Sequence, residues 1–296
     1  SYAILGLTAA KVAPPASSVQ WLVGQQCDDG SFMAYRSGEC TPADTTAFTG
    51  PDTNSTALAA LALKAIGEGA RARAAASWLT SVRNADGGWP WIDGLDSDPV
   101  STGLVMQALR AVLPASPAID IGDRWIRRHM LGCREAQLAG GMPFYAGGAP
   151  DSLSTVSVLL GSVRPTSAGM TDQRAATPVP GCDTAPSARA ALSRFVSRQL
   201  LNGNGVLPGM TGGAGWNETA LAVLGLVGSG VGGRATQAAV QRLMRHVDDY
   251  VGVGQQVKPA ALGVLLLVAR ASGASPRSFG PQDRDLVTAL LATRRT

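Results

Sequence analysis

Acidic and aromatic side chains gather in four segments of this sequence, each followed by a run of small apolar residues. The segments span residues 28–52, 86–98, 144–151 and 216–218. Two carboxyl groups that face each other across a cleft can act as general acid and general base, as glycoside hydrolysis requires. The residues that could supply such a pair are Asp28, Asp29, Asp93, Asp96 and Glu218. Loop aromatics around a concavity bind small molecules instead, so acid–base chemistry and binding both stay open.

Some of these residues also have a structural explanation. Asp52, Asp98 and Asp151 precede Ser or Thr at the start of an apolar run, which is the pattern of a helix N-cap. Phe and Trp after a glycine turn have the pattern of wedges between helices. The aromatic residues that lie in loops outside the repeating unit predict a ligand surface. The full candidate set for ligand binding is Phe32, Tyr35, Phe48, Asp52, Trp89, Trp91, Asp96, Asp98, Phe144, Tyr145, Asp151, Trp216 and Glu218.

Cysteine and histidine usage argues against a metal site. No Cys-x-x-Cys spacing is present, and the two histidines, His129 and His246, stand away from any suitably placed cysteine. An even number of cysteines favours disulfides in an exported chain, with free buried thiols as the alternative. The expected pairs are Cys27 with Cys40, which bracket a short loop, and Cys133 with Cys182.

A repeat runs along the whole chain. Its copies open with Asp52-Thr-Asn-Ser-Thr-Ala-Leu, Asp98-Pro-Val-Ser-Thr-Gly-Leu, Asp151-Ser-Leu-Ser-Thr-Val and Gly215-Trp-Asn-Glu-Thr-Ala-Leu. A fifth copy at residues 257–262 has lost its polar start, and residues 2–7 match residues 221–226. Each copy predicts a helix that is apolar nearly all round, and such a helix must be buried.

Amphipathic segments lie between these buried helices and predict half-exposed ones. They are residues 19–26, 71–83, 123–131, 188–201, 234–250 and 283–295. The alternation predicts an all-α fold, an (α/α)6 toroid of about six hairpins that forms one domain over residues 1–296. Residues 164–186 are expected to form a long loop or flap. Connections from outer to inner helices open at the inner-helix N-termini, so the acidic and aromatic segments should surround one mouth of the ring.

Composition excludes several classes of protein. Hydrophobic residues make up 45% of the chain and charged residues 16%, which is typical of a folded globular protein. No apolar run is long enough to span a membrane. The net charge of +4 comes from scattered basic residues, so nucleic-acid binding is not expected. The chain begins with Ser1 and not with Met, which suggests a processed N-terminus. Together with paired cysteines, this start indicates a secreted or cell-surface protein.

A second repeat carries a family resemblance. Trp21-Leu-Val-Gly-Gln-Gln-Cys-Asp-Asp-Gly-Ser-Phe32 matches Trp78-Leu-Thr-Ser-Val-Arg-Asn-Ala-Asp-Gly-Gly-Trp89 without a gap. Leu and Gln on a helix, followed by Gly-x-aromatic, resemble the QW repeat of the terpenoid cyclase and protein prenyltransferase toroid. The Asp-x-x-Ser-Thr helix start is similar to that of exported actinobacterial proteins with prenyltransferase or squalene-oxidase repeats. The same toroid forms the cobalamin-binding domain of the transcobalamin and intrinsic factor family.

The resemblance implies activities that the residues at the key positions do not all support. A class II terpene cyclase protonates its substrate with the middle acid of an Asp-x-Asp-Asp-Thr-Ala motif. Asn54 stands in that place, and an amide cannot deliver this proton. The zinc set of a protein prenyltransferase, made of Asp, Cys and His, is missing.

We therefore expect a non-catalytic exported protein that holds a small amphipathic molecule at the mouth. A corrinoid is the first ligand that the resemblance implies, and no cofactor is certain. One alternative is a carbohydrate-active (α/α)6 enzyme that acts on a glycan with a carboxylate pair. The other is an isoprenoid or terpene cyclase-like enzyme with a degenerate acidic motif. Because no segment could form the small β domain that closes over cobalamin in that family, a membrane transporter or capping protein is an expected partner.

Overall fold

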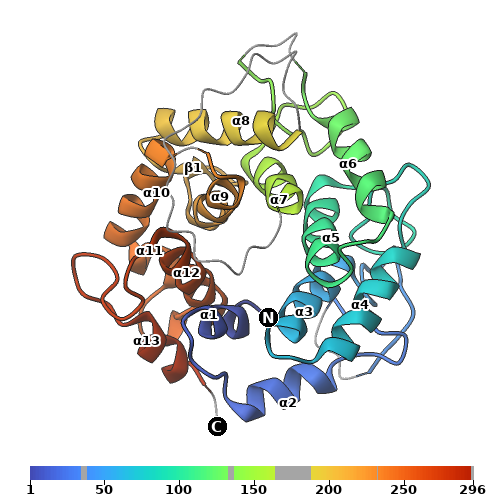
Figure 1. The fold of residues 1–296 in the computed structure, drawn as a ribbon, viewed down its shortest axis with the longest axis horizontal. Coiled ribbons are helices and arrows are strands. Elements are labelled where there is room, and N and C mark those ends of the chain that lie inside the picture. Colours follow the sequence, from blue (N-terminus) through green and yellow to red (C-terminus); the bar gives the residue numbers. More distant parts are fainter. Residues whose placement is uncertain (35–38, 133–136, 164–187, 232, 295–296) are drawn as a thin grey trace.

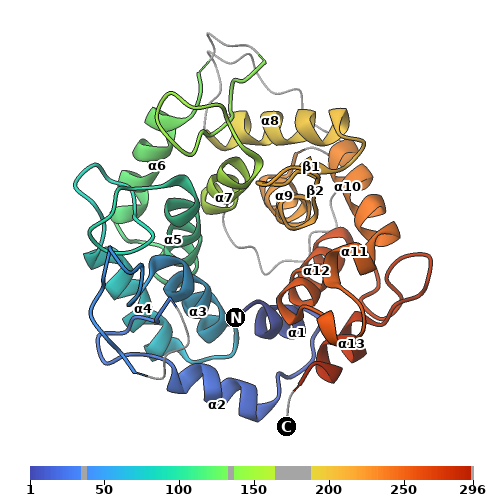
Figure 2. The same ribbon diagram turned by 180° about the vertical axis from the view of Figure 1, so that it is seen from behind.

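Two concentric rings of helices make up the protein (Figure 1). The computed structural model describes residues 1–34, 39–132, 137–163, 188–231 and 233–294. The inner helices are α1 (Tyr2–Ala9), α3 (Thr53–Ala65), α5 (Pro99–Val112), α7 (Ser152–Ser162), α9 (Trp216–Ser229) and α12 (Pro259–Ser272). The outer helices are α2 (Ala16–Gly24), α4 (Gly69–Ser81), α6 (Ala118–His129), α8 (Ala188–Asn202), α10 (Gly233–Arg245) and α13 (Leu286–Ala292). The same arrangement is seen from behind in Figure 2, and it confirms the predicted all-α toroid.

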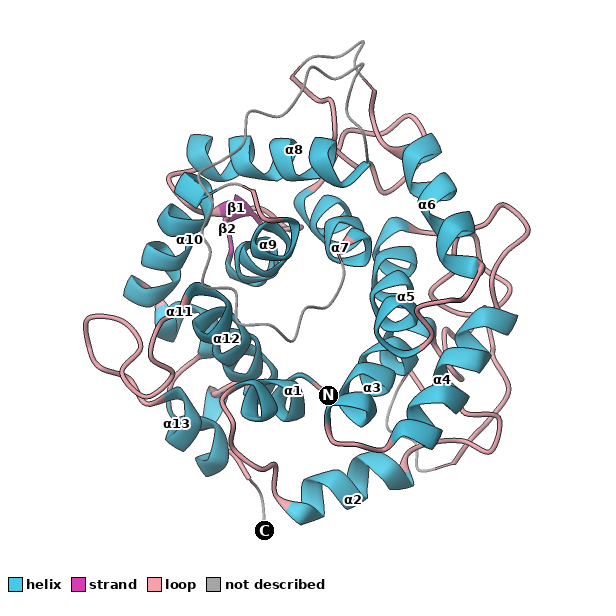
Figure 3. Cartoon of the chain, viewed as in Figure 1, coloured by secondary structure: helices cyan, strands magenta, loops and turns pink. Residues whose placement is uncertain are grey.

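Short elements complete the described part of the chain (Figure 3). Strand β1 (Leu207–Pro208) pairs antiparallel with β2 (Ala214–Gly215) just before α9. The outer helix predicted over residues 234–250 is broken at His246, whose backbone leaves the helical region, and continues as α11 (Val247–Val251). A single 3₁₀ turn, Gly254–Gln256, then leads to α12.

Small residues let neighbouring inner helices approach closely. A Cβ atom added at Gly103 of α5 would lie 2.3 Å from the backbone of Ser157 in α7. At the other side of the ring, a Cβ added at Gly6 of α1 would lie 2.5 Å from the carbonyl oxygen of Gly263 in α12. Helix α1 packs against both α12 and α3, so the first and last inner helices close the ring.

The second sequence repeat forms a turn that follows each outer helix and is hydrogen-bonded to the next inner helix. Gly30 and Gly87 have φ near +94° and +99°, which favours glycine, and a Cβ at Gly30 would meet the backbone of Ala74 in α4. A threonine in the first turn of the following inner helix accepts the backbone N–H two residues after the glycine. These hydrogen bonds run from Phe32 to Thr56, Trp89 to Thr102, Met142 to Thr155 and Leu207 to Thr219.

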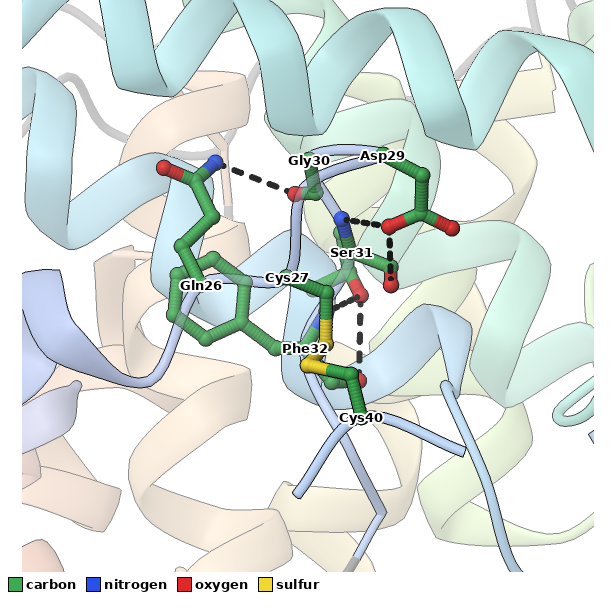
Figure 4. The surroundings of a disulfide bond; sticks show 8 residues. Gln26, Cys27, Asp29, Gly30, Ser31, Phe32 and Cys40 are labelled. Carbon is green, nitrogen blue, oxygen red and sulfur yellow. Dashed lines mark hydrogen bonds between the residues drawn. A yellow bond between two sulfur atoms is a disulfide. The ribbon is translucent and has the colours of Figure 1, made fainter. Parts of the chain in front are cut away.

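A disulfide ties down the first of these turns (Figure 4). Cys27 is bonded to Cys40, as expected from the sequence, and the Cys27 N–H donates to the Ser31 carbonyl at 3.0 Å. The Gln26 amide donates to the carbonyls of Gly30 and Arg71, which joins the turn to α4. The expected Cys133–Cys182 pair and the expected flap over residues 164–186 lie outside the described residues. Within the described part, no helix has the length and apolarity needed to cross a membrane.

Candidate ligand-binding mouth

The inner helices begin at one face of the ring, and three predicted aspartate caps are confirmed there. Asp52, Asp98 and Asp151 accept the backbone N–H three residues ahead at 2.7–2.8 Å. Burial raises the pKa of the Asp52 and Asp98 carboxyls, and the hydrogen bonds from Ser55 and Ser101 oppose part of that effect. Asp52 is only 2% exposed. These carboxylates are placed to hold helix starts.

Two adjoining pockets open at this mouth, one on each side of the start of α1. The first, here called the Phe32 pocket, has a volume of about 340 Å³, and the second, the Glu218 pocket, about 490 Å³. Tyr2 and Ala260 line both of them. The two pockets therefore share a wall that is formed by the first turns of α1 and α12.

The Phe32 pocket has a mixed wall, in which the polar residues Gln25, Glu39 and Ser55 lie among apolar ones. Its lining includes Trp21, Leu22, Phe32, Met33, Leu58 and Ala59. Phe32 reaches this place because its backbone N–H donates to the Thr56 hydroxyl at 2.9 Å. Cys40 also lines the pocket, and the disulfide holds it beside the turn that carries Phe32 (Figure 4).

The Glu218 pocket is built from the β1–β2 turn and the starts of α9 and α12. Its lining includes Tyr2, Trp216, Glu218, Asp249, Tyr250 and Lys258. The Tyr250 hydroxyl donates to the Asn217 side chain at 3.0 Å. The Trp216 ring stacks on His246 with centroids 5.0 Å apart, and the His246 Nδ1 lies 2.7 Å from an Asp249 carboxylate oxygen. These contacts lie at the point where the predicted outer helix breaks.

Burial raises the pKa of both tyrosines that line this pocket, and nearby charge adds to the rise for one of them. Desolvation raises the pKa of Tyr2 to about 12. Desolvation also raises the pKa of Tyr250, and the negative charges of Tyr2 and Glu218 add to that rise. The lining of this pocket holds two carboxylates, Glu218 and Asp249, and one ammonium group, Lys258, so its net formal charge is negative.

Four of the predicted rim aromatics form pairs away from these pockets. Phe48 stacks on Trp91 with ring centroids 6.0 Å apart, and Phe144 meets Tyr145 edge to face at 4.7 Å. Trp89 is fully buried, and its indole N–H donates to the Leu79 carbonyl, so it acts as a wedge. The remaining aromatic candidate, Tyr35, lies outside the described residues.

Three of the five candidate carboxylates share a pocket, and the other two lie elsewhere. Asp28, Asp29 and Asp93 line a third pocket of about 490 Å³ beside the disulfide, whereas Glu218 lies in the pocket next to α12. Asp29 is engaged by the backbone N–H and hydroxyl of Ser31. Asp96 lines none of these three pockets. Among the described residues, no group of three or more His, Cys, Asp and Glu side chains could hold a metal ion.

Asn54 occupies the place that the resemblance gives to a proton donor. It is in the first turn of α3, and its side-chain oxygen is buried without a hydrogen-bond partner in the described part of the chain. The Ser101 and Ser154 hydroxyls at the starts of α5 and α7 share this condition. Buried polar atoms of this kind are commonly satisfied by ordered water.

The residues of the mouth that were not among the sequence candidates include Tyr2, Tyr250 and Lys258. They belong to the beginning and end of the chain and meet only because the ring closes. One feature of the sequence could have pointed to Lys258. It stands directly before its helix, where the other repeats carry an aspartate or a glycine.

Comparisons with known proteins support the fold. No protein-family model matches the chain, and no curated protein matches it. A protein from Actinoplanes has a similar structure, with a TM-score of 0.63 and 19% identity over 98% of this chain and 81% of the other. A type II terpene cyclase from Scytonema, in complex with geranylgeranyl dihydroxybenzoate, gives a TM-score of 0.62 and 14% identity, with 99% of this chain and 80% of the other covered. For a Candida albicans protein geranylgeranyltransferase-I, the TM-score is 0.45 and the sequence identity 13%, with 70% of this chain and 58% of the other covered.

Proposed function

We propose that this protein binds a small amphipathic molecule at the mouth of the ring without converting it. The observation that supports the proposal most is the pair of pockets that share Tyr2 and Ala260. Each pocket combines apolar or aromatic side chains with a charged group, Glu39 in the Phe32 pocket and Glu218 in the Glu218 pocket, so a ligand with an apolar tail and a polar head would match them.

We propose binding without catalysis because of the residues that lie near the pockets. Asn54 replaces the acid of the cyclase motif, and Asp52 is buried and committed to its helix cap. Among the carboxylates of the glycan-hydrolysis alternative, Asp28, Asp29 and Asp93 line a pocket apart from these two pockets, and Asp29 is already engaged by Ser31 there. A corrinoid is much larger than either pocket, so a slender ligand such as an isoprenoid suits their volumes of about 340 and 490 Å³ better.

The disulfide supports an extracytoplasmic place for this binding function. Disulfides persist in oxidising compartments and are rare in the reducing cytosol. Cys27–Cys40 lies at the wall of the Phe32 pocket. We include secretion, and delivery of the ligand to a transporter or capping protein, in the proposal.

A blocked pocket tests the proposal. Ala260 is exposed and lines both pockets, so Ala260→Phe should fill the shared wall and weaken farnesol binding at least tenfold. Ala70→Phe is the matched control, because Ala70 is exposed in α4 and lines neither pocket. Binding is followed by tryptophan fluorescence, with cyanocobalamin titrated in parallel. Equal affinity in both variants would refute the proposal, as would an unmodified protein that binds neither farnesol nor a farnesyl analogue with a charged head.

A further inference from the structure

The Glu218 carboxylate is unusual among the acidic groups of the mouth. Glu218 is 9% exposed and lines the Glu218 pocket. It makes no hydrogen bond or ion pair within the described residues, in contrast to Asp52, Asp98 and Asp151. Its carboxylate oxygens are not among the fully buried polar atoms that lack a partner, so they can be reached from the pocket, and the first turn of α9 places the positive end of the helix dipole beside them.

The surroundings of Glu218 indicate what partner it lacks. Trp216, Tyr2 and Tyr250 supply ring surfaces around the cavity, and Asp249 adds a second carboxylate that already faces His246. Lys258 is exposed and is not within ion-pair distance of Glu218. Burial is the main cause of the raised pKa of Tyr250, and the charge of Glu218 adds to it.

We propose that the Glu218 pocket recognises a positively charged amine, so that the amphipathic ligand carries an ammonium group at its polar end. An ammonium group can donate a charge-assisted hydrogen bond to the Glu218 carboxylate. The aromatic rings stabilise the same charge through cation–π contacts. A neutral hydroxyl gains only the weaker hydrogen bond, and a carboxylate head is repelled. This inference rests on the proposed binding function and names the chemistry of its polar end.

Three probes with one tail and different heads test this inference. Farnesylamine, farnesol and farnesoic acid are titrated into the full chain at pH 7 by isothermal titration calorimetry, below the concentrations at which they self-associate. Farnesylamine is expected to bind at least tenfold more tightly than farnesol, and farnesoic acid most weakly. The preference should decrease as salt is added, because it is electrostatic.

Two variants assign the preference to Glu218. Glu218→Gln keeps the size of the side chain and is expected to make farnesylamine and farnesol bind equally. Glu68→Gln is the matched control, because Glu68 lies before α4, outside both pockets, and pairs with Arg71. The Glu68→Gln variant should still bind farnesylamine at least tenfold more tightly than farnesol.

The outcomes separate this inference from the proposed function. If the unmodified chain binds farnesylamine and farnesol with equal affinity, the amine inference is overturned while the binding function stands. If none of the three probes binds, both are overturned. A preference that survives in Glu218→Gln also overturns the inference. The comparison of heads on the unmodified chain does not depend on how well the variant folds.

Discussion

Single hydrogen bonds at the starts of the inner helices connect the sequence repeat to the architecture. Thr102 is fully buried and accepts the Trp89 N–H at 3.0 Å. The same bond recurs in three further hairpins of the described chain. The threonine in the first turn of each of these helices therefore holds the turn before the helix as well as being part of the helix.

Removing one of these hydroxyls tests that role. Thr102→Val leaves the buried Trp89 N–H without an acceptor, and such a loss costs about 1–3 kcal/mol. The free energy of unfolding, measured with urea, should fall by that amount. Thr80→Val is the control, since the Thr80 hydroxyl only donates to the Ala76 carbonyl of its own helix. Equal effects of the two changes would contradict the account.

Asp86 gives the stability a defined pH dependence. Burial alone would raise its pKa, but hydrogen bonds from Gly88, Trp125 and Ser97 outweigh it, and the charge of His129 adds to them, so the pKa is lowered. A lowered folded-state pKa stabilises the protein above the ordinary carboxyl pKa of about 4, and that contribution is lost as the pH falls through the lowered value.

The Asp86→Asn variant should reveal this contribution. At pH 6 it is expected to melt a few degrees below the unmodified protein, because an amide cannot replace the carboxylate as an acceptor for all three donors. The difference should shrink steadily below about pH 4, as Asp86 becomes protonated in the unmodified chain. Melting temperatures followed by circular dichroism between pH 3 and 6 measure it, and a difference that grows toward pH 3 would be evidence against this role.

At the scale of elements, close contacts between inner helices set the diameter of the ring. Helices α5 and α7 approach each other through Gly103 and Gly161, where an added Cβ would lie within 2.5 Å of backbone atoms of the other helix. Neither backbone can move without displacing its neighbours in the ring. Glycine is needed here for space, whereas Gly30 and Gly87 are needed for their positive φ.

Gly103→Ala tests this packing. Alanine favours a helix by about 1 kcal/mol over glycine, but overpacking of a tight core costs about 1–3 kcal/mol or more. We expect a net loss of stability in chemical denaturation. Gly24→Ala in α2 is the matched control, because nothing lies within 4 Å of an added Cβ there, and it should leave the stability unchanged or slightly higher. A neutral Gly103→Ala would mean that α5 and α7 can move apart.

At the scale of the whole molecule, local patterns allowed the fold to be predicted but not the pockets. The helix alternation, the aspartate caps and the Cys27–Cys40 bond depend on residues near each other in the sequence. The mouth depends on ring closure, which brings Tyr2 beside Glu218 and Lys258. No periodicity indicates which residues of the first and last hairpins will meet.

Burial was also hard to predict for the aromatics. Phe32 and Trp89 occupy matching places in the repeat, yet Phe32 lines a pocket and Trp89 does not. The difference comes from the neighbours of each turn. Phe32 faces the junction between α1 and α3, while Trp89 is covered on all sides by the second and third hairpins, including Gly122 of α6.

The central claim is that the ring holds an amphipathic molecule and does not convert it. The most direct measurement is native mass spectrometry of the protein after incubation with farnesol, followed by extraction and chemical identification of the bound compound. The account predicts a complex of one farnesol with one chain, from which farnesol is recovered unchanged. A protein that forms no such complex, or that releases a cyclised product, would contradict it.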